Sequence, residues 1–237
     1  MDLDLEQVLC ITFDLDDTLW ECAPVIHRAE EQFYRWLESH YPHITQRFSY
    51  AKLLENRMTY MRAHSNELHN LTRLRKNWLR QLAQLCGHDE ALVELGFNIF
   101  WQARNQVELF DDVETTLERL GADYIIGAIT NGNADVSKIG INHLFDFVVT
   151  SEEVDVSKPD SKIFAAAASK AGVKIESILH VGDDPFKDVM GAMNAGAMAA
   201  WVKLDSDSWS EKSPPHIIVS HVRELLDVLN SRSLDLI

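Results

Sequence analysis

The stretch Phe13-Asp14-Leu15-Asp16-Asp17-Thr18-Leu19 decides how this chain folds and what chemistry it can carry. It closes an apolar run, Val8 to Phe13, that has the length and composition of a buried strand. Asp14 and Asp16 lie two residues apart, so along an extended chain their carboxylates would share one side unless the backbone bends. Like charges that close disfavour each other's ionised form unless a cation joins them. The pattern therefore indicates a divalent metal at a strand end.

A calcium-binding loop of the EF-hand type also begins Asp-x-Asp, and it is the first alternative to a catalytic site. That loop needs glycine at its sixth position and glutamate at its twelfth. Counted from Asp14, this chain has Leu19 and Val25 at those positions. The sequence therefore excludes the calcium loop and favours a catalytic site.

Three further polar groups follow the first one along the chain, two of them directly after predicted buried strands. They are, in order, Thr130-Asn131-Gly132, Lys158-Pro159 and Gly182-Asp183-Asp184, with Asp188 five residues beyond Asp183. Taken singly, each is at least as easily explained as a turn or the start of a helix. The loops at the carboxyl ends of parallel strands converge on one crevice, so the four groups together indicate one active site.

The four groups also resemble motifs I to IV of the haloacid dehalogenase-like hydrolases, in the right order. Motif I of that family reads hhhDxDxT, and the match here spans residues 8 to 203. The resemblance implies an α/β fold: a three-layer αβα, Rossmann-like core with a parallel sheet, into which an α-helical cap of the C1 type is inserted.

The resemblance implies roles for individual residues as well. Asp14 would be the nucleophile that becomes an aspartyl-phosphate, and Asp16 would act first as general acid and then as general base. Mg²⁺ would be held by Asp14, by the backbone carbonyl of Asp16 and by Asp183. The residues implied to bind the phosphoryl group are Thr130, Asn131, Gly132 and Lys158. The residues implied to support the metal site without binding the ion directly are Thr18, Asp184 and Asp188.

Two interpretations stay open for the acidic residues that follow Asp183. Asp184 can act as a helix N-cap, because Pro185 stands at the first helical position after it. Asp188 can bind a water of the metal shell. The sequence does not decide which of the two contacts that shell. Nearby, His180 is expected to pack beside the motif rather than to bind metal.

The order of elements predicts two domains. From Glu114 onward, strand-like runs alternate with amphipathic segments, as in βαβ units with a parallel sheet. Long helices without a strand are predicted before that, with breaks near Tyr41-Pro42 and Cys86-Gly87. We predict a core of residues 1–20 and 109–237 and a helical cap of residues 21–108. The predicted core elements are strands 124–130, 146–150, 178–182, 198–203 and 216–219, and helices 114–120, 161–171, 185–195 and 222–229.

The composition is that of an acidic globular protein. Its 237 residues are 46% hydrophobic, enough for a large core, and the formal net charge is -15. Nucleic acid and anionic membranes both require basic patches, so the charge argues against either as a partner. The three cysteines form no CxxC pair, and neither a signal sequence nor a run of about 18 apolar residues is present. These features predict a cytoplasmic protein, and the family resemblance implies a small phosphate ester as its partner. They leave the oligomeric state undetermined.

Several functions fit these motifs. Family members that dehalogenate carbon centres lack the second aspartate, so Asp16 favours phosphate chemistry. A phosphomutase would keep both aspartates and is not separated from a phosphatase by the motifs. A non-catalytic binding protein with this fold would tolerate the loss of Asp14, Asp183 or Lys158, yet all three are present.

The predicted cap suggests a substrate. Thr72-Arg73-Leu74-Arg75 followed by Trp78, together with the surroundings of the first, second and fourth motifs, resembles bacterial phosphatases that act on flavin mononucleotide and on 5-amino-6-(5-phosphoribitylamino)uracil. The Leu-Arg-x-x-x-Trp element also resembles sugar-phosphate phosphatases such as those acting on N-acylneuraminate 9-phosphate. The rest of the cap matches neither group residue by residue.

Arg75 is the predicted selectivity residue, with Arg73 beside it. Leu71 and Leu79 stand four residues before and after Arg75, at the edge of an apolar helix stripe. From there its guanidinium is expected to point toward the crevice between cap and core and to contact the substrate. The alternative is an ordinary solvated helix face.

Overall fold

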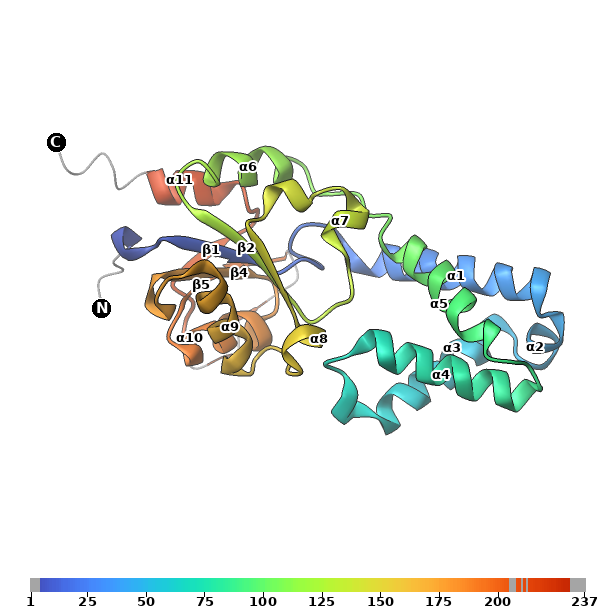
Figure 1. Ribbon diagram of the computed structural model, residues 1–237. Helices are drawn as coiled ribbons and strands as arrows, with labels where there is room; N and C mark the ends of the chain where they lie inside the picture. Colours follow the sequence, from blue (N-terminus) through green and yellow to red (C-terminus); the bar gives the residue numbers. More distant parts are fainter. Residues whose placement is uncertain (1–4, 205–207, 210, 212, 231–237) are drawn as a thin grey trace. The chain divides into compact units, whose positions relative to one another are not determined.

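The computed structural model describes residues 5–204, 208, 209, 211 and 213–230, and these residues divide into two compact units (Figure 1). The sheet unit comprises Met1–Glu21, Glu108–Gly132 and Gly140–Ile237, and the helical unit comprises Cys22–Val107 and Asn133–Ile139. Both ends of the predicted core, residues 1–4 and 231–237, lie outside the described residues.

A parallel sheet forms the centre of the sheet unit. Among the described residues it has six strands in the order β3-β2-β1-β4-β5-β6. Every residue of the central strands β1 and β4 is buried, as expected for strands covered on both faces. The predicted Rossmann-like sheet is therefore confirmed. The strands are β1 (Cys10–Phe13), β2 (Ile125–Thr130), β3 (Phe147–Thr150), β4 (Ile178–Gly182), β5 (Met198–Val202) and β6 (Ile217–Val219).

Helices cover both faces of this sheet. In Figure 1, α6 and α11 lie on one side of the strands and α9 and α10 on the other. The helices of the unit are α6 (Val113–Leu120), α8 (Ser151–Val154), α9 (Ser161–Ala171), α10 (Gly191–Ala195) and α11 (Glu224–Asn230), with the short helical segments η1 (Leu5–Gln7), η3 (Asn142–Leu144), η4 (Ile175–Ser177) and η5 (Pro185–Met190).

The predicted helix 185–195 is divided into two parts. Its first part, η5, is π-helical and the remainder is α10. The carbonyl of Asp184 accepts hydrogen bonds from the backbone N–H groups of both Asp188, at 3.0 Å, and Val189, at 3.3 Å. The widened first turn follows from this shared carbonyl, and π-turns of this kind often occur at functional sites.

The helical unit has the two breaks that the sequence predicted. Pro42 stands in the first turn of α2, where its missing N–H costs no hydrogen bond, and Gly87 ends α4 with a φ of 72°. The helices are α1 (Cys22–His40), α2 (Pro42–Arg47), α3 (Tyr50–Ala63), α4 (Leu71–Cys86), α5 (Ala91–Arg104) and α7 (Val136–Ile139), with the segment η2 (Ser65–Glu67) between α3 and α4.

Residues Asn133–Ile139 belong to the helical unit, although the sequence had assigned them to the core. The backbone N–H of Asp135 donates to Asn105 Oδ1 at 2.7 Å, and the indole of Trp101 donates to the carbonyl of Asn133 at 3.1 Å. These contacts tie the segment to the end of α5. Within the described part of the chain, no helix has the length and apolar character needed to cross a membrane.

Candidate active site

The loop after β1 places Asp14 at the carboxyl end of a central strand. Its backbone N–H donates to the carbonyl of Val181 in β4 at 2.8 Å, and its side chain is largely buried. The backbone then bends, because Asp17 has a φ of 63°, in the left-handed region. Beyond the bend, the indole N–H of Trp20 donates to Asp16 Oδ1 at 2.9 Å and fixes that carboxylate.

A cavity of about 230 Å³ opens at this end of the sheet. It brings the four predicted motifs together within the sheet unit. Thr18 contacts this lining, because its hydroxyl donates a hydrogen bond to Asp183 Oδ1 at 3.1 Å. The lining residues are Asp14, Asp16, Asp17, Thr130, Asn131, Gly132, Lys158, Asp183, Asp184, Lys187 and Asp188.

Lys158 is the buried cation of the cavity. Its Nζ lies 2.5 Å from Asp14 Oδ1 and 2.6 Å from Asp188 Oδ1, and it donates to the carbonyl of Ile129 at 2.8 Å. Burial alone would lower the pKa of Lys158, but the two carboxylates outweigh burial and raise it above the usual value. Lys158 therefore carries its charge inside the protein.

The carboxylates exceed this single positive charge. Burial raises the pKa of Asp14, with Lys158 opposing the shift and the neighbouring Asp188 and Asp183 adding to it. Burial also raises the pKa of Asp183 to about 7, with contributions from Asp188 and Asp17. Both shifts show that ionised carboxylates at these positions need further positive charge.

Asp188 differs from these two carboxylates because donors surround it. Oδ1 contacts Lys158 and lies 3.3 Å from His180 Nε2, and Oδ2 accepts the backbone N–H of Asp184 at 3.0 Å. Burial acts to raise the pKa of Asp188, but Lys158 and His180 together hold it below its usual range.

Asp14, Asp183 and Asp188 form a group that fits a divalent cation. Each offers one carboxylate oxygen, and these oxygens lie within 4.8 Å of one another. Hard cations such as Mg²⁺ prefer oxygen ligands of this kind. Since both oxygens of Asp188 are already engaged, Asp14 and Asp183 are the better placed direct ligands. The side chain of Asp16, held by Trp20, does not belong to this group.

The loops after β2 and at Lys158 are joined to each other. Asn131 donates its amide Nδ2 to the carbonyl of Lys158 at 3.0 Å and accepts the backbone N–H of Lys158 on Oδ1 at 2.7 Å. Thr130 Oγ1 accepts the backbone N–H of Gly132 at 2.9 Å. The hydroxyl proton of Thr130 is therefore left to donate to an anion in the cavity. The Gly132 N–H, predicted to bind phosphate, is directed to Thr130 here.

Asp184 acts as the N-cap that the sequence allowed. Its Oδ1 accepts the backbone N–H groups of Phe186, at 3.0 Å, and Lys187, at 2.9 Å. Lys187 Nζ contacts Asp184 Oδ2 at 2.7 Å, and Lys187 also lines the cavity. Lys187 was not predicted from the sequence, although its position three residues after a helix N-cap places it in the first turn.

The structure contradicts the predicted direction of Arg75. Its guanidinium is buried in the helical unit, where Nη1 and Nη2 donate to the two carboxylate oxygens of Glu30 at 2.8 and 3.0 Å. It also lies over the ring of Phe100, 3.2 Å from the ring centre. A buried carboxylate on α1 holds Arg75 inside, so its selectivity role loses geometric support. Arg73 is half-exposed, near Glu67, and its role stays a prediction.

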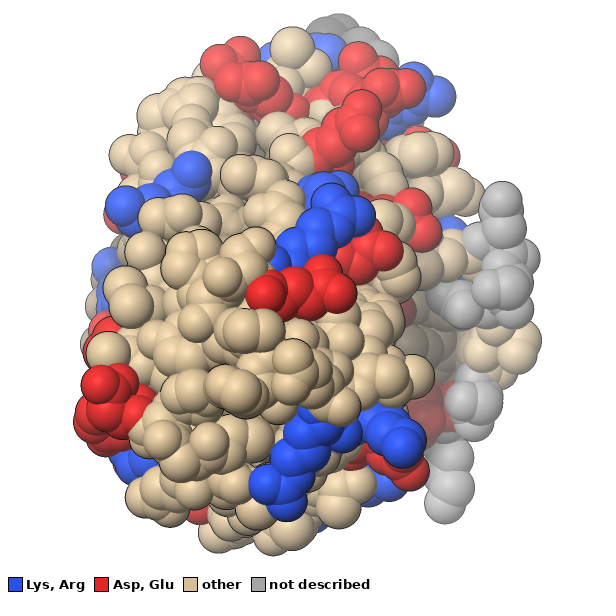
Figure 2. Space-filling model, turned by 90° about the vertical axis from the view of Figure 1, so that its right-hand side faces the viewer, with Lys and Arg blue, Asp and Glu red and all other residues tan. Residues whose placement is uncertain are grey.

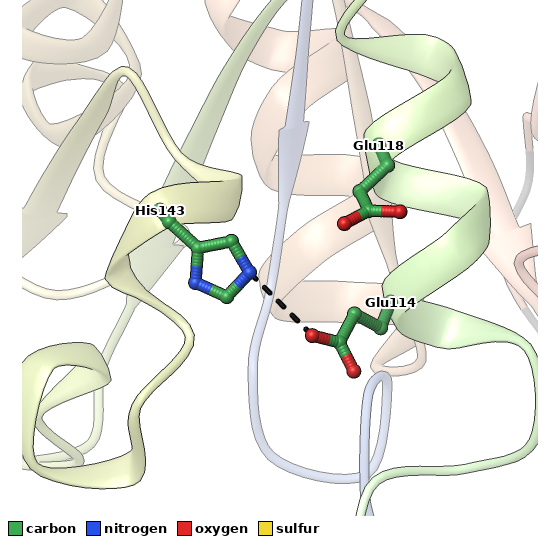
Figure 3. A group of neighbouring side chains, drawn as sticks. All are labelled: Glu114, Glu118 and His143. Atoms are coloured by element: carbon green, nitrogen blue, oxygen red, sulfur yellow. Dashed lines mark ion pairs between the residues drawn. The ribbon is translucent and has the colours of Figure 1, made fainter.

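A second group of metal-ligating side chains lies outside the cavity lining (Figure 3). Glu114 and Glu118 extend from α6 toward His143 of η3, and Glu114 Oε1 lies 3.5 Å from His143 Nε2. All three residues are exposed. Exposed acidic groups of this kind are common without a metal ion.

Comparison with known proteins identifies the family. The model for haloacid dehalogenase-like hydrolases matches residues 8–196. The chain belongs to this family. It is 30% identical to 5-amino-6-(5-phospho-D-ribitylamino)uracil phosphatase YigB of Escherichia coli (strain K12), over 95% of this chain and 98% of that protein. It is 27% identical to N-acylneuraminate-9-phosphatase of Homo sapiens, over 97% and 96% of the two chains.

Solved structures agree with this assignment. The crystal structure of a 2-haloacid dehalogenase from Pseudomonas syringae pv. Tomato DC3000 matches with a TM-score of 0.88 and 33% identity, over 95% of this chain and 99% of that one. The predicted family, the Rossmann-like fold and the status of the chain as an enzyme of this hydrolase family are therefore confirmed.

Proposed function

We propose that this protein is a Mg²⁺-dependent phosphatase that hydrolyses a small phosphate monoester through an aspartyl-phosphate on Asp14. The main support is one cavity in which Lys158 contacts Asp14 while Asp183 and the second aspartate, Asp16, line the same space. Such a cavity offers a nucleophile, an acid/base group and positive charge together, which phosphoryl transfer requires.

The first step forms the covalent intermediate. A carboxylate oxygen of Asp14 bonds to phosphorus while the bond from phosphorus to the alkoxide oxygen breaks. Asp16 gives its proton to that alkoxide, with its carboxyl group held by the indole of Trp20. Lys158 and the hydroxyl of Thr130 bind phosphoryl oxygens. Mg²⁺, held by Asp14, Asp183 and the Asp16 carbonyl, would supply positive charge for the carboxylates and the transferring group.

The second step releases phosphate. Asp16, now ionised, takes a proton from a water molecule as that water attacks phosphorus. The bond between phosphorus and Asp14 breaks, inorganic phosphate leaves and the Asp14 carboxylate is restored. The same residue thus serves as acid and base in turn.

Dehalogenation is the second candidate function, because the Pseudomonas syringae relative is named a 2-haloacid dehalogenase. A halide leaving group needs no proton, whereas an alkoxide does. In the proposed reaction Asp16, which lines the cavity and accepts a hydrogen bond from Trp20, would supply that proton. This favours phosphate over halide chemistry.

The relatives suggest the substrate class. YigB is named for a ribityl-uracil phosphate and the human relative for N-acylneuraminate 9-phosphate. We propose the riboflavin-pathway pyrimidine phosphate and flavin mononucleotide first, and a sugar phosphate second; a phosphomutase reaction is the further alternative. On the face shown in Figure 2, Lys and Arg are interspersed with Asp and Glu, in keeping with a small-molecule partner. The cytoplasmic location stays a prediction.

One panel of substrates tests the proposal. Purified protein is incubated with an aryl phosphate, flavin mononucleotide, the ribityl-uracil phosphate, N-acylneuraminate 9-phosphate and 2-chloropropionate, with Mg²⁺ or with a chelator. We expect Mg²⁺-dependent release of inorganic phosphate and no release of chloride. Chloride release without phosphate release would establish the dehalogenase instead, and an isomeric phosphate ester as product would establish the mutase.

A further inference from the structure

Two buried polar side chains lie behind the cavity, on neighbouring strands. Thr12 of β1 and His180 of β4 are register partners in the parallel sheet. Both are fully buried, and Thr12 Oγ1 lies 2.9 Å from His180 Nδ1. The other ring nitrogen, Nε2, lies 3.3 Å from Asp188 Oδ1. A polar pair inside a sheet core is costly unless its hydrogen bonds are satisfied, so these contacts hold the pair together.

The chemistry of the partners fixes the direction of both hydrogen bonds. Asp188 contacts the charged Lys158 and, as a carboxylate, can only accept, so His180 Nε2 carries a proton and donates to it. Full burial disfavours the charged form of the ring and lowers the pKa of His180, so the ring is neutral and its Nδ1 accepts. The Thr12 hydroxyl must then donate to Nδ1. The ring of Phe164 meets His180 edge to face, with 5.2 Å between ring centres, and fixes its plane.

Asp188 has little freedom apart from these bonds. A methyl group added at Gly182 would lie 2.6 Å from Asp188 Oδ2, so the carboxylate packs directly against the β4 backbone. Lys158 Nζ in turn lies between Asp188 and Asp14. The orientation of Asp188 therefore sets where the lysine charge lies relative to the nucleophile.

We propose that Thr12 and His180 are positioning residues for phosphoryl transfer: Thr12 selects the Nε2-protonated form of His180, which orients Asp188 and thereby directs Lys158 toward Asp14. This inference rests on the proposed phosphatase activity. It adds two residues that are not among those lining the cavity, and it predicts that they act on the chemical step as one unit.

The first test is kinetic. Thr12→Val removes the hydroxyl at nearly constant shape, and Thr12→Ser retains it. His180→Leu removes both ring bonds, and His180→Gln keeps a donor near the position of Nε2. With an aryl phosphate, we expect Thr12→Val and His180→Leu to lower kcat about tenfold with KM within about twofold, which corresponds to about 1.4 kcal/mol. The Ser and Gln variants should recover most of the loss, and the double variant should lose no more than His180→Leu alone.

The control variant is Thr116→Val, which alters a threonine of α6 that is buried outside the cavity lining. It should leave kcat unchanged, and thermal unfolding of every variant should show whether the fold is retained. An unchanged kcat in a folded Thr12→Val variant, or fully additive losses of kcat in the double variant, would overturn the proposed positioning role of Thr12 and His180.

The second test needs neither substrate nor metal. The ¹⁵N chemical shifts of His180 in the wild-type protein report which ring nitrogen carries the proton. We expect the Nε2-protonated form, and Thr12→Val should weaken that preference. A ring protonated on Nδ1 alone overturns the inference even if the enzyme is a phosphatase. If the wild type releases no phosphate, the proposed function is wrong. The His180 tautomer still shows separately whether Thr12, His180 and Asp188 are hydrogen-bonded as proposed.

Discussion

The position of Asp14 makes it reactive and also makes its charge costly. Lys158 offsets part of that cost, and removal of the Asp14 charge leaves Lys158 paired with Asp188. Asp14→Asn should therefore fold like the wild type but lose roughly 10³-fold or more in kcat, because an amide cannot serve as the nucleophile. Phosphate release and circular dichroism measure the two effects. Mass spectrometry of trapped wild type should place the added group on Asp14; near-normal turnover by Asp14→Asn contradicts this mechanism.

Asp16 is predicted to act in both steps, and different leaving groups separate them. A nitrophenolate departs without a proton, so Asp16→Asn should form the intermediate readily from an aryl phosphate. The variant then lacks a base for the attacking water. We expect a rapid burst of about one nitrophenolate per enzyme followed by slow turnover, and no burst with an alkyl phosphate. Stopped-flow absorbance follows the burst. Equal slowing of both substrates without a burst would mean that Asp16 only binds.

At the scale of elements, α1 and α4 are joined by a charge pair that stabilises the helical unit. Glu30 and Arg75 are both buried, and Arg57 also approaches Glu30, at 3.1 Å. Arg75→Met keeps much of the packing but leaves the Glu30 carboxylate short of positive charge. Loss of one partner of a buried pair costs about 3–5 kcal/mol, so thermal unfolding should begin at clearly lower temperature.

Arg73→Met provides the matched control, because that side chain is half-exposed and its loss should change stability by about 0.5 kcal/mol or less. The substrate panel applied to both variants also examines selectivity. If Arg75→Met instead unfolds at the wild-type temperature and loses activity only on the preferred substrate, that result would support the selectivity role predicted from the sequence.

The elements differ in how much the sequence could predict. β1 and β4 were predictable because apolar runs ending in acidic residues mark buried strands with polar ends. The pairing of Thr12 with His180 was not, because register depends on how two distant strands align. The π-helical turn of η5 depends on a shared carbonyl that residue types do not specify. The predicted direction of Arg75 was wrong for a related reason, because its partner Glu30 lies 45 residues away on another helix.

For the molecule as a whole, the sheet unit alone contains every predicted core motif, while the helical unit contains the predicted selectivity residues. The motifs could be located from the sequence because parallel strands bring their carboxyl ends to one edge. Substrate choice could not be predicted from the sequence, because side-chain packing among helices determines which polar groups stay accessible. The buried ion pair of Arg75 is an example.

Metal binding should stabilise the folded protein, since the three carboxylates that would hold the metal are brought together only when the strands are assembled. Asp14, Asp183 and Asp188 are close together with one buried lysine between two of them, and a divalent cation would relieve their repulsion. A ligand at about 100 times its Kd adds about 2.7 kcal/mol to the folded state. We expect Mg²⁺ to raise Tm by several degrees and a chelator to reverse the rise.

Two groups of metal-ligating side chains among the described residues make this measurement specific. Asp183→Asn should abolish the Mg²⁺-dependent rise in Tm and increase the Mg²⁺ concentration needed for half-maximal activity. Glu118→Gln, which alters the exposed group on α6, should leave both unchanged because solvated side chains there have no desolvated charge to relieve. If the rise in Tm survives Asp183→Asn but disappears with Glu118→Gln, the stabilising metal binds at the surface and the active-site assignment of Asp183 is wrong.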